Sequence, residues 1–505
     1  MVALDLGTTA FKAAPVIADG VCGDVAVASY ELEYGDGQRV TCDPWLYVRL
    51  AVRALRRAVR SAAAQGLRVT AIGLTSQAQT FVAVHERQEA RGEGREARGE
   101  GREARGERRG ARGEGQEARG ERRGARGEGR EARGEGRSPF SPPLSALEPD
   151  PAVVWTDASA AEEADEAAQA LPDFAATCGF VRPSPLQFLP KVMRLRRTAY
   201  AGDGAHGSVR YLLLNEWIAL NLTGTAFGDT NLHAMGGLLD LRAMGGPREA
   251  HGKPHVYWND RALALAGITS ENLAPIAHAA AISAPLSTPM CRALGLECPV
   301  PVYSCGNDQS CAAAGAGLDD PRDAFANFGT ALVVYGLKDR PATPSRDDHI
   351  AGVSPLLHDG MPWWYLLGVE SECGNMVEWL ASLLYRRSRI GRMIEDALAL
   401  PDDARLPAAL PRGGGAMDLQ NLRLDMGPPH VVRSLLEHYS SRFGELLYSV
   451  VEGRPRRVLA GGGLSRSRAW LDFLARRHGI RVEATGIEHP GLVGVARIVG
   501  LRTEG

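Results

Sequence analysis

The sequence lacks several features that would point to whole classes of protein. It has no excess of charge, since 58 Lys and Arg residues stand against 60 Asp and Glu residues and leave a formal net charge of −2. Such a chain has no field that would attract nucleic acid or an anionic membrane surface. Nowhere do about 18 apolar residues run together, which argues against a transmembrane helix. We therefore expect a small-molecule partner, and neither nucleic acid nor a membrane.

Paired cysteines are also missing, and we expect no secretory leader. The eight cysteines are scattered, and none forms the Cys-x-x-Cys pair that suits zinc or redox exchange. The N-terminus has no basic stretch and reaches Asp5 almost at once, unlike a signal peptide. These observations predict free thiols in a reducing compartment and a cytoplasmic protein.

Large apolar residues are absent from residues 88–137, where seven near-copies of one Arg-, Gly- and Glu-rich heptad follow one another. No helical stripe could bury surface there, and frequent glycines weaken any helix. We expect a disordered insertion in a domain that resumes beyond it. The alternative is an RNA-binding Arg-Gly tract, although interleaved Glu cancels most of the charge and no aromatic side chain is present to stack on bases.

What remains reads as alternating strands and helices, the pattern of an α/β fold. At 505 residues the chain is too long for one core, so two domains are expected. The apolar runs predict strands at 2–6, 71–75, 300–304, 331–335 and 457–460, and the helical patterns predict helices at 46–64, 160–170, 211–222, 372–384 and 431–451.

Three glycine-bearing turns follow predicted strands. In the first, residues 5–9, glycine lets the backbone approach a phosphate, two threonines add hydroxyl donors, and Asp5 can hold a hydrated Mg²⁺. A plain hairpin turn fits this segment equally well. Similar turns at 327–330 and 460–465 make three unrelated hairpins a poorer explanation.

An acid follows a fourth strand. Asp308 stands in the turn after residues 300–304 and before a helix of small residues at 312–316. The carboxyl ends of strands in an open α/β sheet are where such sheets bind ligands. Asp308 is therefore the candidate general base, and a helix-capping aspartate is the alternative.

In this order, the motifs resemble those of the FGGY carbohydrate kinases, the sugar-kinase branch of the superfamily that also holds actin and the heat-shock chaperone ATPases. The resemblance rests on residues 5–12, 72–79, 155–157, 190–191, 222–224 with Asp229, 306–317, 329–330, 430–437 and 461–463. It implies two ribonuclease-H-like domains with an interdomain catalytic cleft. Residues 1–317 would form the sugar-binding and catalytic domain, and residues 318–505 the nucleotide-binding domain.

The resemblance also assigns roles residue by residue. It places Asp5 on Mg²⁺, Thr8, Thr9 and Lys12 on the ATP phosphates, Gly329 and Thr330 on the γ-phosphate, and Gly461, Gly462 and Gly463 against the adenosine. It makes Asp308 the base that takes the proton of the attacking sugar hydroxyl, and it puts Gln77, Gln79 and Asp157 in or beside the sugar pocket. ATP and Mg²⁺ are the implied cofactors, and a homodimer is left open.

Some positions depart from the family pattern. Ser159 stands where the family commonly has Arg, and Arg194 where it often has Trp. The usual C-terminal Gly-Ala-Ala segment is reduced to residues 494–496, so a short last helix is expected over the adenine side. The sequence thus predicts an ATP-dependent kinase of a small ketose or polyol. A xylulokinase is the nearest specific alternative, and a nucleotide-binding homologue without turnover is the alternative from another class.

Overall fold

The computed structural model describes residues 1–18, 20–86, 147–201, 209–245, 257–385, 389–413 and 415–503. These described residues belong to one compact unit. The repeat at 88–137 lies outside them, so its predicted disorder stays a prediction. All eight cysteines are described and free, as expected. No helix of the described part of the chain has the length and apolar character needed to cross a bilayer.

The first of three larger sheets carries the N-terminus at its centre. Its strand order is β14-β15-β7-β1-β2-β3, with β4 also paired to β2. The strands are β1 (Val2–Leu6), β2 (Ala10–Ile17), β3 (Gly20–Val21), β4 (Ala26–Ser29), β7 (Ile72–Ser76), β14 (Ser283–Pro285) and β15 (Pro301–Asn307). Strands β1, β7 and β15 run parallel, so their carboxyl ends meet at one edge.

The second sheet repeats part of this plan. Its order is β18-β19-β17-β16-β22-β23, formed by β16 (Asp323–Phe328), β17 (Leu332–Lys338), β18 (His349–His358), β19 (Met361–Glu370), β22 (Arg457–Gly461) and β23 (Arg481–Ala484). As β1 does in the first sheet, β16 makes an antiparallel hairpin with the next strand and a parallel pair with a later one. The first two glycine turns therefore occupy equivalent places in the two sheets.

A third sheet and two small strand pairs complete the strands. The third sheet has the order β11-β8-β10-β6-β5, with β9 on β8, and consists of β5 (Glu33–Tyr34), β6 (Val40–Cys42), β8 (Phe81–Glu86), β9 (Leu147–Pro149), β10 (Ala152–Val153) and β11 (Arg210–Leu213). The pairs are β12 (Gly228–Asp229) with β13 (Ile276–Ala277) and β20 (Ala408–Gly413) with β21 (Ala416–Gln420).

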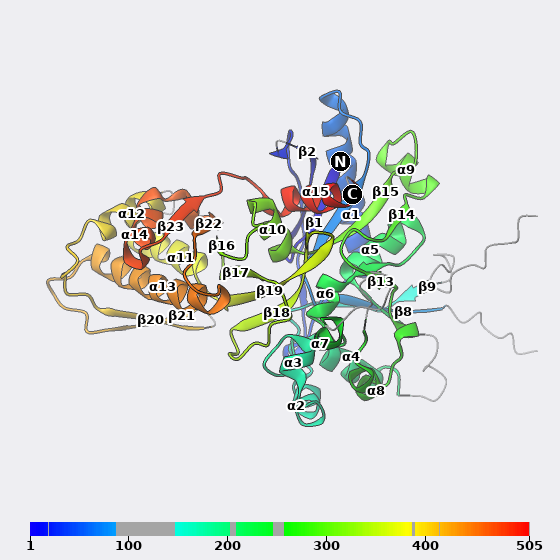
Figure 1. Ribbon diagram of the computed structural model, residues 1–505, viewed down its shortest axis with the longest axis horizontal. Helices are drawn as coiled ribbons and strands as arrows, with labels where there is room; N and C mark the ends of the chain where they lie inside the picture. The colour runs from blue at the N-terminus through cyan, green and yellow to red at the C-terminus, as the bar shows by residue number, and fades with distance from the viewer. Residues whose placement is uncertain are drawn as a thin grey trace, which may run out of the picture. The chain divides into compact units, whose positions relative to one another are not determined.

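Fifteen α-helices lie in the described residues (Figure 1). They are α1 (Pro44–Ala64), α2 (Ala161–Ala170), α3 (Phe174–Cys178), α4 (Phe188–Thr198), α5 (Leu214–Thr223), α6 (Thr230–Ala234), α7 (Leu241–Met244), α8 (Asp260–Ala266), α9 (Thr288–Leu294), α10 (Asp308–Ala316), α11 (Gly374–Leu384), α12 (Ile390–Leu398), α13 (Pro428–Val450), α14 (Arg468–His478) and α15 (Pro490–Thr503).

Local signals account for the longest predicted helix of the first half. Helix α1 begins after Asp43, whose side chain accepts a hydrogen bond from the backbone N–H of Trp45, and Pro44 occupies the first turn. Buried residues then recur at helical spacing from Tyr47 to Ala62. This face joins the core beneath the first sheet, as the sequence pattern indicates.

The C-terminal helix differs from expectation. Helix α15 has 14 residues and packs against α10 and the first sheet, and in Figure 1 it lies beside α10 and β1. Close approach is possible because both helices carry glycine: a Cβ on Gly494 would lie 1.7 Å from the carbonyl oxygen of Cys311, and one on Gly315 would lie 1.8 Å from that of Pro490. The expected short last helix is wrong, since α15 runs over 14 residues, and its place relative to adenine stays a prediction.

The other sequence-based elements hold with one change. The five strands and four of the helices appear with boundaries shifted by a few residues. The helix expected at 211–222 is instead strand β11 followed directly by α5. Helices α10 and α15 share a core with residues of the first and second sheets, among them Ala3 of β1 and Phe325 of β16.

Candidate active site

The first glycine turn closes a hairpin at the carboxyl end of β1. Strands β1 and β2 run antiparallel, with Asp5 opposite Lys12. A Cβ on Gly7 would lie 2.9 Å from the carbonyl oxygen of Ala10, so only glycine fits this path. The hydroxyl of Tyr30 donates to the Gly7 carbonyl at 2.7 Å and holds the turn from β4's side. The motif is a hairpin turn that carries the predicted phosphate-binding side chains.

Asp5 has an unsatisfied carboxylate oxygen. Its Oδ1 atom is buried and has no hydrogen-bond partner. Burial and the nearby charge of Asp308 raise the pKa of Asp5 to about 7, while Lys12 acts in the opposite direction. A buried carboxylate oxygen without a partner is costly unless a cation or a proton satisfies it. Asp5 therefore fits a role beside a cation.

The donor set suits a hydrated Mg²⁺ better than a fully protein-coordinated metal. Among the described residues, no group of three or more His, Cys, Asp or Glu side chains could hold a metal ion. Mg²⁺ is usually held by one or two carboxylates together with waters and substrate phosphates. The orphaned oxygen of Asp5 meets that requirement.

Asp308 is the first residue of α10, at the carboxyl end of β15. The side chain of Asn307 caps the helix by accepting from the backbone N–H of Ser310 at 2.9 Å. Asp308 instead accepts from the backbone N–H of Gln309 at 2.9 Å, and burial raises the pKa of its carboxyl group. The alternative of a helix-capping Asp308 is therefore wrong, because Asn307 fills that position.

The second and third glycine turns lie against each other on the second sheet. Strands β16 and β22 run parallel, with Asn327 opposite Gly461. Gly462 has a φ of 84°, and a Cβ there would lie 2.5 Å from the carbonyl carbon of Phe328. The carbonyl groups of Gly329 and Thr330 accept backbone hydrogen bonds from residues 373–374. The two turns are thus fixed together at the carboxyl ends of their strands.

A single side-chain bond links these turns to the candidate base. The amide of Asn327 donates to Oε1 of Gln309 at 3.2 Å, and Gln309 directly follows Asp308. From the other side, the hydroxyl of Thr75 on β7 donates to the carbonyl oxygen of Gly306 at 2.9 Å. Residues from β1, β7, β15 and β16 therefore converge around the start of α10.

Gln77 is the predicted sugar ligand with an unused donor. Its Oε1 accepts from the hydroxyl of Thr8 at 2.7 Å, whereas its Nε2 is buried without a hydrogen-bond partner. Tyr30 lies near Gln77; its hydroxyl donates to Gly7, and its oxygen keeps the capacity to accept. A buried amide nitrogen of this kind fits an acceptor oxygen supplied by a ligand.

Gln79 and Asp157, the other two predicted sugar ligands, have their functional atoms engaged by the protein. Gln79 accepts from the backbone N–H of Phe188 at 2.8 Å and donates to the carbonyl oxygen of Met235. Asp157 accepts from the backbone N–H of Val40 at 2.7 Å through one oxygen, and from Ser159 through the other. These bonds suit residues that support the site, and direct substrate contact by either stays a prediction.

Two aromatic side chains at this site, Trp155 and Tyr30, were not among the predicted site residues. Trp155, 37% exposed, donates from its indole Nε1 to the Thr8 hydroxyl at 2.8 Å. Tyr30 fixes Gly7, as described above. Trp155 lies in a segment that matches a family motif, so the motif could have identified this side chain, whereas no local signal marks Tyr30.

The ammonium group of Lys191 donates to the carbonyl oxygens of Val154 and Trp155 at 2.8 and 3.0 Å.

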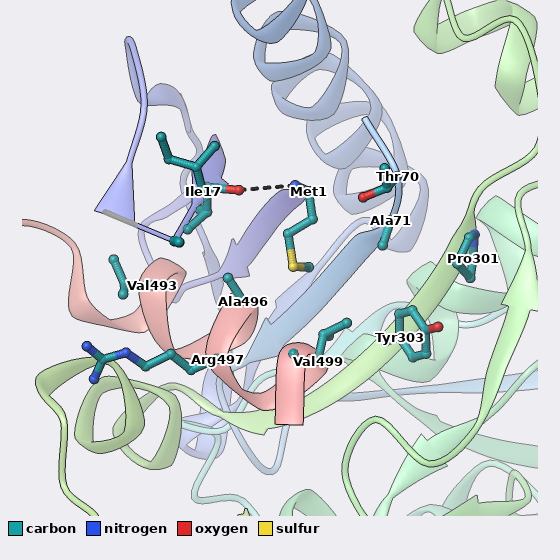
Figure 2. Close-up of a pocket in the computed structure, with 13 residues that line it drawn as sticks. Met1, Ile17, Thr70, Ala71, Pro301, Tyr303, Val493, Ala496, Arg497 and Val499 are labelled. Atoms are coloured by element: carbon teal, nitrogen blue, oxygen red, sulfur yellow. Dashed lines mark hydrogen bonds between the residues drawn. The ribbon is translucent and has the colours of Figure 1, made fainter. Parts of the chain in front are cut away.

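A cavity of about 590 Å³ lies at the opposite edge of the first sheet (Figure 2). It is lined by the amino ends of β1, β7 and β15 and by α15, including Met1, Ala71, Pro301 and Ala496. The amino group of Met1 donates to the carbonyl oxygen of Val16 there. Because the candidate catalytic residues stand at the carboxyl ends of the same strands, this cavity is separate from them.

Comparisons with known proteins place the fold. No protein-family model matches the chain, and no curated protein sequence matches it significantly. Several solved structures match the chain over nearly its whole length. A ligand-bound xylulose kinase from Lactobacillus acidophilus matches with a TM-score of 0.76 at 15% identity, over 100% of this chain and 89% of that chain. A xylulose kinase from Rhodospirillum rubrum gives 0.74 at 19% identity, over 99% and 89%.

A third match comes from a differently named enzyme. Plasmodium falciparum glycerol kinase with ADP gives a TM-score of 0.72 at 15% identity, over 100% of this chain and 90% of that chain. Matches across nearly the full length of enzymes with different substrates establish the architecture and leave the substrate open. The chain therefore has the α/β two-domain fold of the FGGY carbohydrate kinases.

Proposed function

We propose that this protein is an ATP-dependent kinase that transfers the γ-phosphoryl group to a hydroxyl of a small, neutral sugar or polyol. The observation that carries the proposal is the place of Asp308. It stands at the start of α10, electrostatically coupled to Asp5 of the first glycine turn and connected through Gln309 to Asn327 beside the second. A carboxylate between two turns that would bind phosphate suits phosphoryl transfer, which depends on a base positioned beside the transferred group.

Asp308 would act as the general base. A sugar hydroxyl beside its carboxylate gives up its proton to that carboxylate as the hydroxyl oxygen bonds to the γ-phosphorus. The bond from that phosphorus to the bridging oxygen of ADP breaks in the same displacement. Burial raises the pKa of Asp308, and a base is most effective when its pKa lies near the working pH.

The first hairpin turn would hold the phosphates. Thr9 and Lys12 would supply hydroxyl and ammonium donors, and Asp5 would hold Mg²⁺ through water molecules. The Thr8 hydroxyl donates to Gln77 and would have to leave that bond to donate to a phosphate. Bound Mg²⁺ would neutralise charge on the β- and γ-phosphates. On the second sheet, Gly329 and Thr330 would cover the γ-phosphate, with the glycines at 461–463 against the adenosine.

A neutral acceptor fits the described polar groups better than a sugar acid. Gln77 offers an uncharged donor. The buried side chain of Lys191 already donates two of its hydrogens to the carbonyl oxygens of Val154 and Trp155. Of the solved structures that match this chain, at least three are named xylulose kinases and one a glycerol kinase, which supports a ketose or polyol, whereas one is named a gluconate kinase. Xylulose is the first compound to test.

The test is a screen of ATP consumption with Mg²⁺ across ketoses, aldoses, polyols and sugar acids, run in parallel with Asp308→Asn. We expect acceptor-dependent ADP formation with at least one neutral compound and its loss in the variant. Nucleotide binding without turnover on any acceptor would contradict the kinase proposal and favour the non-catalytic homologue. A sugar acid as the best acceptor would contradict the neutral substrate class.

A further inference from the structure

Asn231 joins the turn that carries Asp308 to the second sheet. It lies on α6, directly after β12, and its side chain is fully buried. Helix α6 packs between β15 of the first sheet and β18 of the second. Asp229, two residues before Asn231, belongs to one of the motifs that resemble the FGGY carbohydrate kinases.

Every hydrogen-bonding position of the Asn231 amide is used. Its Oδ1 accepts from the backbone N–H of Asn307 at 2.7 Å and from the side-chain amide of Asn307 at 2.8 Å. Its Nδ2 donates to the carbonyl oxygen of Val353 at 2.6 Å and to the hydroxyl of Ser310 at 3.1 Å. One side chain thus bonds to Asn307 just before Asp308, to Ser310 two residues after it, and to β18.

The backbone of the turn is shaped around this side chain. Gly306 has a φ of 102°, and a Cβ there would lie 2.7 Å from Oδ1 of Asn231. Asp229, two residues before Asn231, accepts from the backbone N–H of Gly306 at 3.1 Å and from the hydroxyl of Ser304. The same short segment therefore fixes the turn at Gly306 and at Asn307, immediately before the acid.

The hydrogen bond from Asn231 to Val353 on β18 links the Asp308 turn to the second sheet. Strand β18 belongs to the sheet whose β16–β17 hairpin carries Gly329 and Thr330. Ser310, the second partner of the Asn231 amide, also lies 3.2 Å from the hydroxyl of Tyr335 on β17. Asn231 and Ser310 therefore connect the start of α10 to the sheet that carries the second glycine turn.

We propose that Asn231 is a positioning residue that sets the Asp308 carboxylate relative to the second sheet, so that base and γ-phosphate are held in line. This inference rests on the proposed kinase function. Asn231 touches neither substrate nor the reacting atoms and acts only through the turn. A displacement of about 1 Å at a reacting group can cost on the order of 10²-fold in rate.

The test is Asn231→Ser, with Asn272→Ser as the matched control. Asn272 is also buried, and its side chain bonds to Val209 and Thr269, which lie outside the catalytic turn. Both variants lose a satisfied amide and should lower the thermal midpoint. Only Asn231→Ser should reduce kcat per folded molecule, by about 10²-fold, with the KM for ATP close to that of the wild type.

A double variant separates positioning from a general loss of structure. If Asn231 acts through Asp308, adding Asn231→Ser to Asp308→Asn should lower kcat little further, because residues that act as a unit are not additive. A full multiplicative loss, or a kcat for Asn231→Ser equal to that of Asn272→Ser, would overturn the inference. If Asn231→Ser does not fold, Asn231→Asp keeps the size and loses the two donors, and it is compared in the same way.

Failure of the proposed function gives a different result. A wild-type protein without acceptor-dependent ATP turnover would remove both the kinase function and this role of Asn231. Turnover in the wild type together with an unaffected Asn231→Ser would remove the positioning role alone.

Discussion

The hydroxyl of Thr8 donates a hydrogen bond of 2.7 Å to Oε1 of Gln77. The same hydroxyl accepts from the indole of Trp155 at 2.8 Å. Thr8 is predicted to bind phosphate and Gln77 to bind sugar, so the two predicted subsites share one hydrogen-bonded chain. The orientation of the Gln77 donor therefore depends on a residue of the phosphate turn.

Replacing Thr8 should consequently disturb both substrates. In Thr8→Val the hydroxyl is lost, and the Oε1 of Gln77 and the indole N–H of Trp155 each lose a partner. Leaving a buried polar group without a partner costs about 1–3 kcal/mol, which corresponds to a rise in KM of roughly 5- to 150-fold for the sugar as well as for ATP. Thr8→Ser keeps the hydroxyl and is the matched control. A rise in the KM for ATP alone would contradict the shared chain.

Asp308→Asn should leave the fold and nucleotide binding intact while lowering kcat. The amide cannot take the proton of the sugar hydroxyl, and loss of a general base costs on the order of 10²–10⁴-fold. Steady-state ATP turnover and calorimetric nucleotide binding would be measured together. Asp320→Asn is the control, because Asp320 pairs with Arg322 at 2.7 Å near the surface and should affect neither quantity. A kcat near the wild-type value would exclude Asp308 as the base.

The Mg²⁺ requirement should depend on pH through Asp5. Burial and the charge of Asp308 raise the pKa of Asp5 to about 7, so Asp5 carries a proton below that pH, and this proton competes with the metal for the carboxylate. The Mg²⁺ concentration for half-maximal turnover should rise as the pH falls below about 7. Asp5→Asn should need more Mg²⁺ at every pH and lose this dependence. An unchanged Mg²⁺ response in the variant would return Asp5 to the role of a turn residue.

Lys191 should make the stability of the protein depend on pH. Burial lowers the pKa of Lys191 to about 7, although the charge of Asp157 raises it in part. Below that pH the lysine is protonated in both the folded and the unfolded chain. Between about 7 and the ordinary value near 10.4, only the unfolded chain binds the proton, so this group increases the free energy of unfolding by up to about 1.4 kcal/mol per pH unit.

Urea unfolding of the wild type and of Lys191→Met between about pH 7 and pH 9.5 would measure this contribution. The variant should lack the part of the slope that comes from the lysine. Equal slopes for the two proteins would show that Lys191 is protonated in the folded state over this range.

The strands and the glycine turns could be predicted from the sequence because these signals are local. The apolar run of β1, the Asp43 cap of α1 and the glycine turns each depend on neighbouring residues. The apolar run that contains β11 and the start of α5 has no breaker between strand and helix, so its periodicity suits either state. The error at 211–222 follows from that ambiguity.

The environments of Gln79, Asp157 and Asn231 could not be predicted from the sequence, because their hydrogen-bond partners lie far along the chain. Whether Gln79 faces a ligand depends on Phe188 and Met235, which lie far along the chain. The environment of Asp157 likewise depends on Val40. The same limit applies to Asn231, whose place in the structure follows from bonds to Asn307 and Val353. No pattern of spacing identifies such pairs.

The repeat at 88–137 should be dispensable for folding and turnover. The described strands on either side of it, β8 and β9, are antiparallel neighbours, with Glu86 opposite Leu147 and Val84 opposite Pro149. Opposed residues of this kind lie about 5 Å apart, so a short connection can join the two strands as a hairpin. The pairing of β8 with β9 therefore requires only a short connection.

Deleting residues 88–137 and inserting a short Gly-containing turn would test this. The loop becomes roughly fourfold shorter, and since each halving of its length recovers about 0.6 kcal/mol of closure entropy, the free energy of unfolding should rise by about 1 kcal/mol. Thermal midpoint and acceptor-dependent ATP turnover would be compared for the deletion, the full-length chain, and a variant with a Gly/Ser linker of the original length. A fall in both altered proteins would mean that the repeat itself packs on the enzyme or binds a partner. A fall in the deletion alone would mean that the strands need a longer connection than the hairpin register indicates.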